Sequence, residues 1–305
     1  MRRGLVLGCG GTLGGAWMIA ALKAIETQLE WDPRTADVLQ GTSAGAELAT
    51  MLGSGVSVDD LVAMQNGSTT DPRLQAHLAD TPGMIPPLPR AALGSFGLFR
   101  RAQGVVALSG LAPRGSGNPA WLTRLAESLN PDETWVEHPD TRLVALDYDT
   151  GSRAAFGIPS SPPATIEQAL RASWAIPGWF PPVQIGDRRY VDGGVASTAS
   201  VDLLAADELD ELFILAPMAS MSGARAPGLS GFAENQALRK GMTATLRKEI
   251  AAVEAGGTRV FLLDAPAHDL AVLGGNFMDY RRRERVFTYA INALEQRVQA
   301  WEVQK

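Results

Sequence analysis

The pentapeptide Gly41–Gly45 (GTSAG) carries the clearest chemical signal in this sequence. It lies between a short apolar segment, residues 38–39, and a stretch of helical composition that starts near Ala44. A serine between two glycines in this setting is typical of a nucleophile elbow, a tight strand-to-helix turn that exposes the serine hydroxyl. The positive end of the following helix favours negative charge that develops beside Ser43. The pattern therefore indicates nucleophilic chemistry at this serine.

A second glycine cluster, Gly8–Gly14 (GCGGTLG), directly follows the first apolar run of the chain. Such a loop points several backbone N–H groups in one direction, which suits a phosphate or an oxyanion. A dinucleotide-binding loop is the competing interpretation. Its spacing would be G-x-G-x-x-G, whereas this loop reads G-x-G-x-x-x-G. The acidic residue expected after the second strand is also missing, because Gln40 leads directly into the serine turn.

A third feature is the segment Tyr190–Gly194 (YVDGG), in which Asp192 sits on a sharp glycine turn after a short extended run. A carboxylate in this position is well placed to project into a site. Asp-Gly turns are common in loops, so this feature alone does not distinguish a functional aspartate from an ordinary turn.

Taken together, the three features resemble the patatin-like phospholipase family, in which they occur in the same order. The segment Ala172–Pro182 (ASWAIPGWFPP) looks like the family's segment just before the catalytic aspartate. The resemblance runs from about Arg3 to Leu204. It implies a three-layer α/β/α sandwich with a mainly parallel central sheet. We expect a single domain of this kind over residues 1–305, with a lid-like insertion at about 67–118 and a C-terminal helical region at about 277–303, for both of which the resemblance is weaker.

The resemblance also implies a Ser-Asp catalytic dyad, with Ser43 as the nucleophile and Asp192 as the base. The backbone N–H groups of Gly10, Gly11 and Thr12 would form the oxyanion hole. The supporting glycines of the elbow and the turn would be Gly41, Gly45 and Gly193. The implied activity is that of a carboxylic ester hydrolase of phospholipase A, lysophospholipase or esterase type, which degrades lipids through an acyl-enzyme and needs no metal or other cofactor.

One residue departs from the family pattern. The family places Arg or Lys in the glycine loop where this chain has Leu13. Because of this departure, efficient hydrolysis of phospholipids is not implied for this chain. A second class of function also remains open, namely a non-catalytic lipid-binding or acyl-binding module of the same fold. A simple ester or a thioester also remains open as the substrate.

A Ser-Asp-His triad is a further alternative, and the chain has three histidines that could serve it: His77, His138 and His268. Ser43, Asp192 and His268 follow the chain order of α/β-hydrolases. The elbow, however, comes after only about two strands, and the dyad explains the glycine loop and the Asp-Gly-Gly turn better. We therefore favour the dyad over the triad.

The elements that must position these residues alternate between strands and helices. In chain order, strand-like segments occur at residues 4–8, 38–39, 142–146, 154–158, 212–215 and 260–263. A helical pattern runs from Ala16 to Leu29, another begins near Ala44, and Ser57 opens a third. This alternation predicts a mainly parallel sheet with helices on both faces.

Composition narrows the class of protein. The chain has 305 residues, a net charge of −6 and 46% hydrophobic residues, which is ample for a buried core. The negative charge argues against a nucleic-acid partner, because phosphate neutralisation provides most of that affinity. One cysteine excludes an intrachain disulfide. Without an apolar run of membrane-spanning length, we expect a cytoplasmic protein that contacts a membrane surface at most peripherally.

Two regions invite a membrane interpretation. Residues 81–126 contain no acidic residue but five arginines, at positions 90, 100, 101, 114 and 124, and we expect either a lid or an ordinary insertion there. The apolar positions Phe287, Ile291, Leu294, Val298 and Trp301 predict an amphipathic C-terminal helix, for which packing on the core is the favoured interpretation.

Three aromatic residues, Trp174, Trp179 and Phe180, are candidates for lining an acyl pocket or for core packing.

Overall fold

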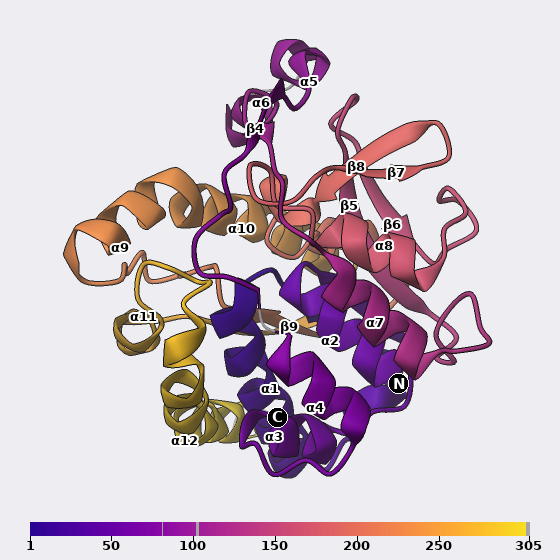
Figure 1. Ribbon diagram of the computed structural model, residues 1–305. Helices are drawn as coiled ribbons and strands as arrows, with labels where there is room; N and C mark the ends of the chain where they lie inside the picture. Colours follow the sequence, from indigo (N-terminus) through magenta and orange to yellow (C-terminus); the bar gives the residue numbers. More distant parts are fainter. Residues whose placement is uncertain (81, 102–103, 303–305) are drawn as a thin grey trace.

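The computed structural model describes residues 1–80, 82–101 and 104–302 (Figure 1). Thr81, at the start of the arginine-rich segment, and residue 303, at the end of the expected C-terminal region, lie outside the described residues. Within the described part, no helix is long and apolar enough to cross a membrane.

A central sheet organises the chain, and within the described residues it has eight strands. Seven of them lie in the order β10-β9-β1-β2-β5-β8-β7, and β6 pairs with β5. Their bounds are β1 Arg3–Leu7, β2 Val38–Thr42, β5 Thr141–Asp147, β6 Arg153–Phe156, β7 Val183–Ile185, β8 Arg188–Asp192, β9 Glu211–Ala216 and β10 Arg259–Asp264. The five strands β10, β9, β1, β2 and β5 run parallel, whereas β6, β7 and β8 join by antiparallel pairing.

Helices cover both faces of this sheet, which confirms the predicted three-layer architecture with a mainly parallel sheet. Leu5 and Leu7 of β1 point into the larger hydrophobic cluster, with side chains of α1 (Gly11–Leu29), α2 (Ala44–Gly53) and α12 (Arg283–Glu302). Val6 points to the opposite face, where α10 (Lys240–Ala255) packs. Because successive side chains of a strand point to opposite faces of the sheet, this five-residue strand contributes side chains to both hydrophobic clusters.

The remaining elements complete these layers. The helices are α3 Val58–Gln65, α4 Pro72–Ala79, α7 Ala120–Leu129, α8 Ile166–Ser173, α9 Gly228–Glu234 and α11 Ala267–Leu273. Four 3-10 turns are η1 Pro33–Thr35, η2 Gly193–Val195, η3 Val201–Leu204 and η5 Tyr280–Arg282, and η4 (Asn235–Arg239) is a π-helix.

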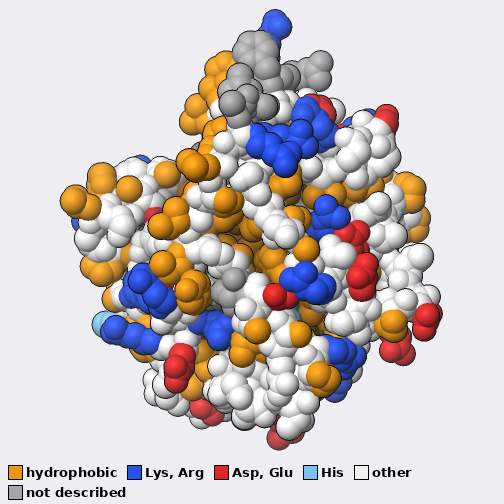
Figure 2. Space-filling model, viewed as in Figure 1, with side chains coloured by type: hydrophobic (Ala, Val, Ile, Leu, Met, Phe, Trp, Pro, Cys, Tyr) orange, Lys and Arg blue, Asp and Glu red, His pale blue; other side chains and the backbone are white. Residues whose placement is uncertain are grey.

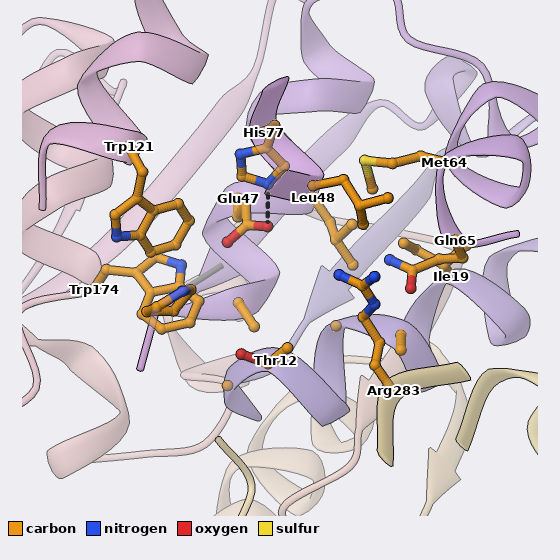
Figure 3. A pocket seen from close by; sticks show the side chains of 16 residues that line it. Thr12, Ile19, Glu47, Leu48, Met64, Gln65, His77, Trp121, Trp174 and Arg283 are labelled. Carbon is orange, nitrogen blue, oxygen red and sulfur yellow. Dashed lines mark hydrogen bonds and ion pairs between the residues drawn. The ribbon is translucent and has the colours of Figure 1, made fainter. Parts of the chain in front are cut away.

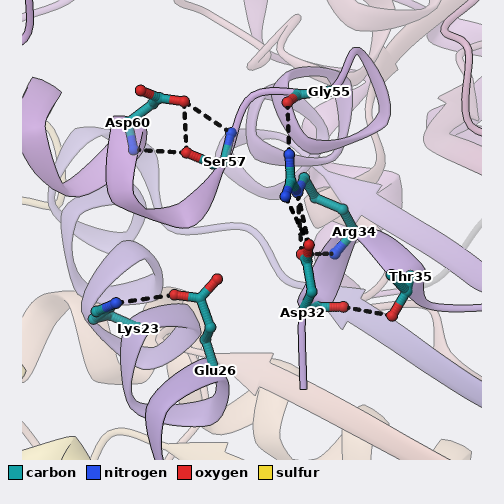
Figure 4. A network of polar contacts seen from close by, with 8 residues as sticks. All are labelled: Lys23, Glu26, Asp32, Arg34, Thr35, Gly55, Ser57 and Asp60. Atoms are coloured by element: carbon teal, nitrogen blue, oxygen red, sulfur yellow. Dashed lines mark hydrogen bonds and ion pairs between the residues drawn. The ribbon is translucent and has the colours of Figure 1, made fainter. Parts of the chain in front are cut away.

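Local sequence sets the ends of several elements (Figure 4). Ser57 and Asp60 form a capping box, in which the Ser57 hydroxyl accepts from the Asp60 N–H at 3.1 Å and starts α3 as expected. Asp32 accepts from the N–H of Arg34 at 2.9 Å and starts η1. The expected start of the first helix at Ala16 is wrong, because α1 begins at Gly11 inside the glycine cluster. The apolar spacing could not show this start, because at the glycine cluster only main-chain hydrogen bonds distinguish a loop from the first turn of a helix.

An arm of residues 82–118 projects from the body at the top of Figure 1. It carries β3 (Arg90–Leu93), α5 (Phe96–Arg101), α6 (Gly104–Ser109) and β4 (Pro113–Arg114), and β3 and β4 form a separate two-stranded sheet. The Tyr148 hydroxyl, just after the end of β5, holds the arm to the body by donating to the carbonyl of Ser109 at 2.8 Å. Residues 102–103 of the arm lie outside the described residues.

The C-terminal helix α12 packs on the core, as its apolar spacing favours. Leu294 and Val298 are fully buried, and the Trp301 ring lies 5.2 Å from that of Phe261 on β10. The apolar face of α12 is therefore covered by α1 and the sheet, and the alternative of a membrane-surface helix does not apply to it.

Candidate active site

The glycine cluster and the serine turn leave the same edge of the sheet. Strands β1 and β2 are parallel neighbours, and Leu7 at the end of β1 pairs in register with Gly41 near the end of β2. Because carboxyl ends of parallel strands meet at one edge, the two glycine-rich turns lie beside each other. The order of strands therefore brings together two motifs that are about 30 residues apart in the sequence.

Ser43 has the strained backbone of a nucleophile elbow, with φ 57° and ψ −120°. Both flanking glycines are required by close packing. A Cβ on Gly41 would lie 2.3 Å from the Gly45 carbonyl oxygen, and a Cβ on Gly45 would lie 1.9 Å from that of Leu7. The elbow thus presses against the end of β1, and this contact maintains the unfavourable dihedral angles of the serine.

The antiparallel pairing of β8 with β5 brings Asp192 close to Ser43. Thr42 pairs with Val144 of β5, and Ala145 of the same strand pairs with Asp192 at the end of β8. A Cβ on Gly193 would meet the Val144 carbonyl oxygen at 2.7 Å, so this glycine allows the close approach. Ser43 and Asp192 therefore face each other across the end of β5, and both line one cavity.

The environment of Asp192 makes its carboxylate a stronger base than an exposed aspartate. Its side chain is buried, and burial raises its pKa to about 7. Hydrogen bonds from the Ser43 side chain and from the Gly194 N–H, the latter at 2.7 Å, oppose this increase by stabilising the ionised form. A carboxylate with a pKa near neutrality can accept a proton from a serine hydroxyl more readily than an ordinary one.

The glycine loop presents backbone N–H groups that have no acceptor in the described residues, namely those of Gly10, Gly11 and Thr12. The neighbouring N–H groups are occupied, because Cys9 donates to the Thr198 carbonyl at 2.8 Å and Leu13 to that of Phe277 at 3.0 Å. Helix α1 starts at Gly11 without a side-chain cap, so its first N–H groups and its positive end are available for an anion.

Two side chains of the glycine loop, those of Cys9 and Leu13, lie in different surroundings. Leu13, which stands where the family has a basic residue, is fully buried in the main hydrophobic cluster and does not line the Ser43 cavity. Cys9 does line that cavity, but burial and the nearby Asp192 raise the pKa of its thiol to about 12. The thiol is therefore protonated at neutral pH and a poor nucleophile.

The cavity beside Ser43 has a volume of about 520 Å³, and we refer to it as the Ser43 cavity. Besides Ser43, Asp192 and the glycine loop, apolar side chains from distant segments line it, among them Leu108, Ile176, Met218, Leu238, Met242 and Phe277. Sequence reasoning missed most of these, because they carry no motif. The π-helix η4, which contributes Leu238, is a type of irregularity that is frequent at functional sites.

The three aromatic candidates for an acyl pocket lie elsewhere. Trp174 lines a different cavity, and it is Ile176 and Pro177 of the same segment that line the Ser43 cavity. Trp179 and Phe180 pack against the base of the arm, where the Gly117 N–H donates to the Trp179 carbonyl at 2.9 Å. Of the two alternatives for these residues, core packing is therefore the correct one, because Trp174 and Phe180 belong to the main hydrophobic cluster and Trp179 packs against it.

None of the three histidines lines the Ser43 cavity. His268 is exposed on α11, whereas His138 Nε2 lies 2.7 Å from the Ala36 carbonyl oxygen. His77 is buried and pairs through Nε2 with Glu47 Oε1 at 2.8 Å. The dinucleotide alternative also finds no support, because the Gln40 amide is fully buried and donates to the carbonyls of Ala199 and Ser200.

Comparisons with known proteins place this geometry in a family. No curated protein matches the chain. Among solved structures, the crystal structure of VipD from Legionella pneumophila matches with a TM-score of 0.42 and 16% identity, covering 98% of this chain and 67% of that one. A family model described as patatin-like phospholipase matches residues 5–205, which include the glycine loop, Ser43 and Asp192. The chain belongs to the patatin-like phospholipase family, whose members hydrolyse ester bonds of lipids.

Proposed function

We propose that this chain is a serine acyl hydrolase that cleaves fatty acyl esters with a Ser43-Asp192 dyad. One observation carries the proposal: a serine in an elbow conformation lines the same cavity as a buried aspartate, whose pKa burial raises to about 7. The pair lies at the wall of an apolar cavity, beside a loop of unoccupied N–H groups. This arrangement supports Ser43 as the nucleophile, Asp192 as the base and the loop as the anion site.

The reaction runs in two halves. Asp192 accepts the proton of the Ser43 hydroxyl while Oγ attacks the ester carbonyl, and a tetrahedral oxyanion forms. The carbon–oxygen bond to the alcohol then breaks, and protonated Asp192 returns its proton to the departing alkoxide. In the second half, Asp192 takes a proton from water as the water oxygen attacks the acyl-enzyme. Collapse of this second intermediate releases the fatty acid and restores the serine.

The surrounding groups support each half of the reaction. The N–H groups of Gly10 and Gly11, which line the Ser43 cavity, and that of Thr12, which lines a neighbouring cavity, are the proposed oxyanion hole at the positive end of α1. The apolar side chains of the Ser43 cavity suit a hydrocarbon chain, since their burial against it removes apolar surface from water. We therefore propose a fatty acyl ester of a lipid, cleaved in the manner of a phospholipase A, a lysophospholipase or an esterase.

We further propose that the arm and α9 bring the enzyme to a lipid surface, with residues 67–118 acting as a lid within a single catalytic domain. Leu88 and Ile85 of the arm are 91% and 75% exposed, and Leu229 of α9 is 88% exposed. Figure 2 shows hydrophobic side chains on the arm and on the end of α9, with Lys and Arg side chains near the base of the arm. Exposed apolar groups next to cations suit an anionic lipid surface. The cytoplasmic location stays a prediction.

The proposal is tested with p-nitrophenyl esters of graded chain length and with a fluorophosphonate probe. We expect the wild type to hydrolyse the esters and to react with the probe, and Ser43→Ala to do neither. His268→Ala serves as the matched control and should retain both. Loss of activity in His268→Ala would replace the dyad with a triad. A folded wild-type protein that neither reacts with the probe nor cleaves any ester would point instead to a non-catalytic lipid-binding module.

A further inference from the structure

A second large cavity lies beside η4 and α10, and we refer to it as the basic cavity. It has a volume of about 450 Å³, and the loop after β9 forms its other wall. Lys240, Thr243 and Arg247 line it and are spaced three and four residues apart, so they share one face of α10. Neither Ser43 nor Asp192 lines the basic cavity, so a group bound there does not meet the nucleophile.

The basic cavity carries positive charge in a chain whose net charge is −6, and none of its described lining residues is acidic. Three lining residues are cationic, namely Arg239, Lys240 and Arg247. The buried Arg239 is neutralised by Glu234, whose Oε1 accepts from its Nη2 at 2.9 Å. Lys240 and Arg247 are exposed, and within the described part of the chain neither forms an ion pair with a carboxylate. Two positive charges are therefore left for a ligand.

Uncharged N–H donors complete the basic cavity. The side-chain amides of Asn235 and Gln236 line it, and neither amide forms a hydrogen bond to another described residue. Arg247 donates one N–H to the Met221 carbonyl at 2.5 Å, which holds the guanidinium in place and leaves its other N–H groups available. A phosphate group has negative charge and several acceptor oxygens, so it matches a guanidinium, an ammonium and two amides.

The basic cavity differs in charge from the two cavities closer to Ser43. Asp192 lines the Ser43 cavity. In the cavity of about 50 Å³ that Trp174 lines, the Glu47 carboxylate and the Arg283 guanidinium border the same space (Figure 3). A phosphate would meet a carboxylate in either of these two cavities, and repulsion would offset its attraction to a cation. Of the three, the basic cavity therefore suits a phosphate best.

Exposed apolar side chains lie next to the basic cavity. Helix α9 leads directly into η4, and its Leu229 and Phe232 are 88% and 48% exposed. The Arg225 guanidinium lies 5.4 Å from the centre of the Phe232 ring, and Arg225 follows Ala224, which lines the cavity. In Figure 1, α9 lies at the left margin of the molecule, away from the central sheet. A soluble phosphate would not use these apolar groups, whereas a lipid has both an anionic headgroup and acyl chains.

We propose that the basic cavity binds the phosphate-bearing headgroup of an anionic membrane lipid, while Leu229 and Phe232 contact the acyl region around it. This lipid anchors the enzyme and is not the ester that is cleaved, because Ser43 does not line the cavity. The inference rests on the proposed contact of α9 with a lipid surface, but it does not depend on catalysis at Ser43. A volume of about 450 Å³ falls within the ordinary range of small-molecule sites, about 300–1,000 Å³.

Vesicle binding at about 0.15 M salt tests the site, since diffuse attraction between charges is then screened beyond about 8 Å. Sedimentation would compare vesicles of neutral phosphatidylcholine with vesicles that also contain phosphatidic acid. The measurements use the Ser43→Ala variant, so that no lipid is hydrolysed during the assay. We expect binding to be at least about tenfold tighter when phosphatidic acid is present, because its phosphate forms charge-assisted hydrogen bonds in the cavity.

Charge-matched variants separate the cavity from general attraction to the surface. Arg247→Gln and Lys240→Gln each remove one positive charge and one phosphate contact, and each should weaken binding to the phosphatidic acid vesicles about tenfold or more. Lys248→Gln is the matched control, because Lys248 is an exposed cation of α10 that does not line the cavity. Its removal should weaken binding at most about fivefold, since Lys248 contributes only to diffuse attraction.

A soluble competitor distinguishes a lipid headgroup from a free phosphate. Inorganic phosphate at the same concentration as the phosphatidic acid should displace little of the bound protein, because it makes no contact with Leu229 or Phe232. Displacement of most of the protein at this concentration would show that the cavity takes a free phosphate, and it would overturn the assignment to a lipid.

The outcomes are distinct from those of the catalytic proposal. Equal binding to the two kinds of vesicle, or equal losses in Arg247→Gln and Lys248→Gln, overturns the inference. In the active enzyme, Arg247→Gln and Lys240→Gln should hydrolyse a soluble short-chain ester like the wild type, since neither residue lines the Ser43 cavity. If phosphatidic acid is preferred but no ester is cleaved, the headgroup site stands and the catalytic proposal fails. If esters are cleaved without this preference, only the headgroup site fails.

Discussion

The backbone N–H of Ser43 donates to the hydroxyl oxygen of Ser173 at 2.9 Å, and the Ser173 hydroxyl donates in turn to the carbonyl of Val144 at 2.7 Å. Both serines are buried, so neither bond is replaced by water at the surface. Ser173 thus connects the last residue of α8 to the strained elbow and to β5, the strand between Ser43 and Asp192 in the sheet. The bridge fixes the elbow at Ser43 relative to the strand that lies between it and Asp192.

Removal of this bridge should therefore weaken both the fold and the proposed activity. In Ser173→Ala, a buried N–H and a buried carbonyl lose a partner, which should lower the free energy of unfolding by about 1–3 kcal/mol. Displacement of Ser43 should reduce kcat about tenfold or more with little change in KM. Ser161→Ala is the control, because it removes one hydroxyl bond, to the Ala155 carbonyl, away from the site. Equal kcat values for the two variants would remove Ser173 from the positioning of the elbow.

The raised pKa of Asp192 predicts the pH dependence of hydrolysis. The base must be ionised to accept the serine proton, so kcat/KM should increase with pH and reach half its plateau at about pH 7. Asp192→Asn should lower kcat about 10²- to 10⁴-fold, since an amide cannot serve as the base. Hydrolysis of a soluble ester between pH 5 and 9 measures both effects. A profile that is flat from pH 5 to 9 in the wild type would contradict this role.

The same pKa makes a prediction about stability. The pKa of Asp192 in the folded state is about 7, above the ordinary value of 3.8, so the fold favours the neutral carboxyl. Its stabilising effect is complete below about pH 4 and is lost as the pH rises through about 7. Asp192→Asn should therefore raise the free energy of unfolding more at pH 8 than at pH 5, by at most about 3 kcal/mol. Urea unfolding at the two pH values measures the difference, and a larger gain at pH 5 would reverse the sign.

The packing of the elbow predicts the effect of a single methyl group. Gly45→Ala would place a Cβ 1.9 Å from the Leu7 carbonyl oxygen and should lower the free energy of unfolding by about 3 kcal/mol. Gly241→Ala is the matched control, because Gly241 lies within α10 with no atom near its Cβ position. It should raise the free energy of unfolding by about 0.5–1 kcal/mol, because alanine favours the helix. Thermal unfolding of both variants decides whether the contact with β1 requires glycine.

Exposed leucines on the arm and on α9 predict a separate effect on lipid surfaces. Leu88→Asp and Leu229→Asp together should lower hydrolysis of esters presented in anionic vesicles about tenfold, because two apolar contacts are lost and two negative charges are gained. Hydrolysis of a soluble short-chain ester should not change, since neither residue lines the Ser43 cavity. Substitution of Met1, which is 80% exposed at the N-terminus, by Asp is the control. Loss of both activities would indicate a damaged fold instead of a lipid contact.

The sequence by itself determined the features that depend on short-range rules. Alternating apolar strands and helical patterns predicted the mainly parallel sheet with helices on both faces, and Ser57 marked the start of a helix. Glycine spacing predicted the turn at Ser43, because only glycine permits the contacts of Gly41 and Gly45. The family follows from the same motifs, since they occur in order over residues 5–205.

Only the tertiary structure decided which side chains share a space. The order of strands brings Asp192 to Ser43, and burial, which no local pattern encodes, brings its pKa near neutrality. Apolar residues far apart in the chain, such as Leu108, Ile176 and Phe277, meet around the Ser43 cavity. Acyl-pocket lining and core packing were both open for Trp174, and the structure places its side chain in the core, whereas Ile176, two residues later, lines the Ser43 cavity. Contacts of this kind depend on the packing of whole elements, which the spacing of residues along the chain does not specify.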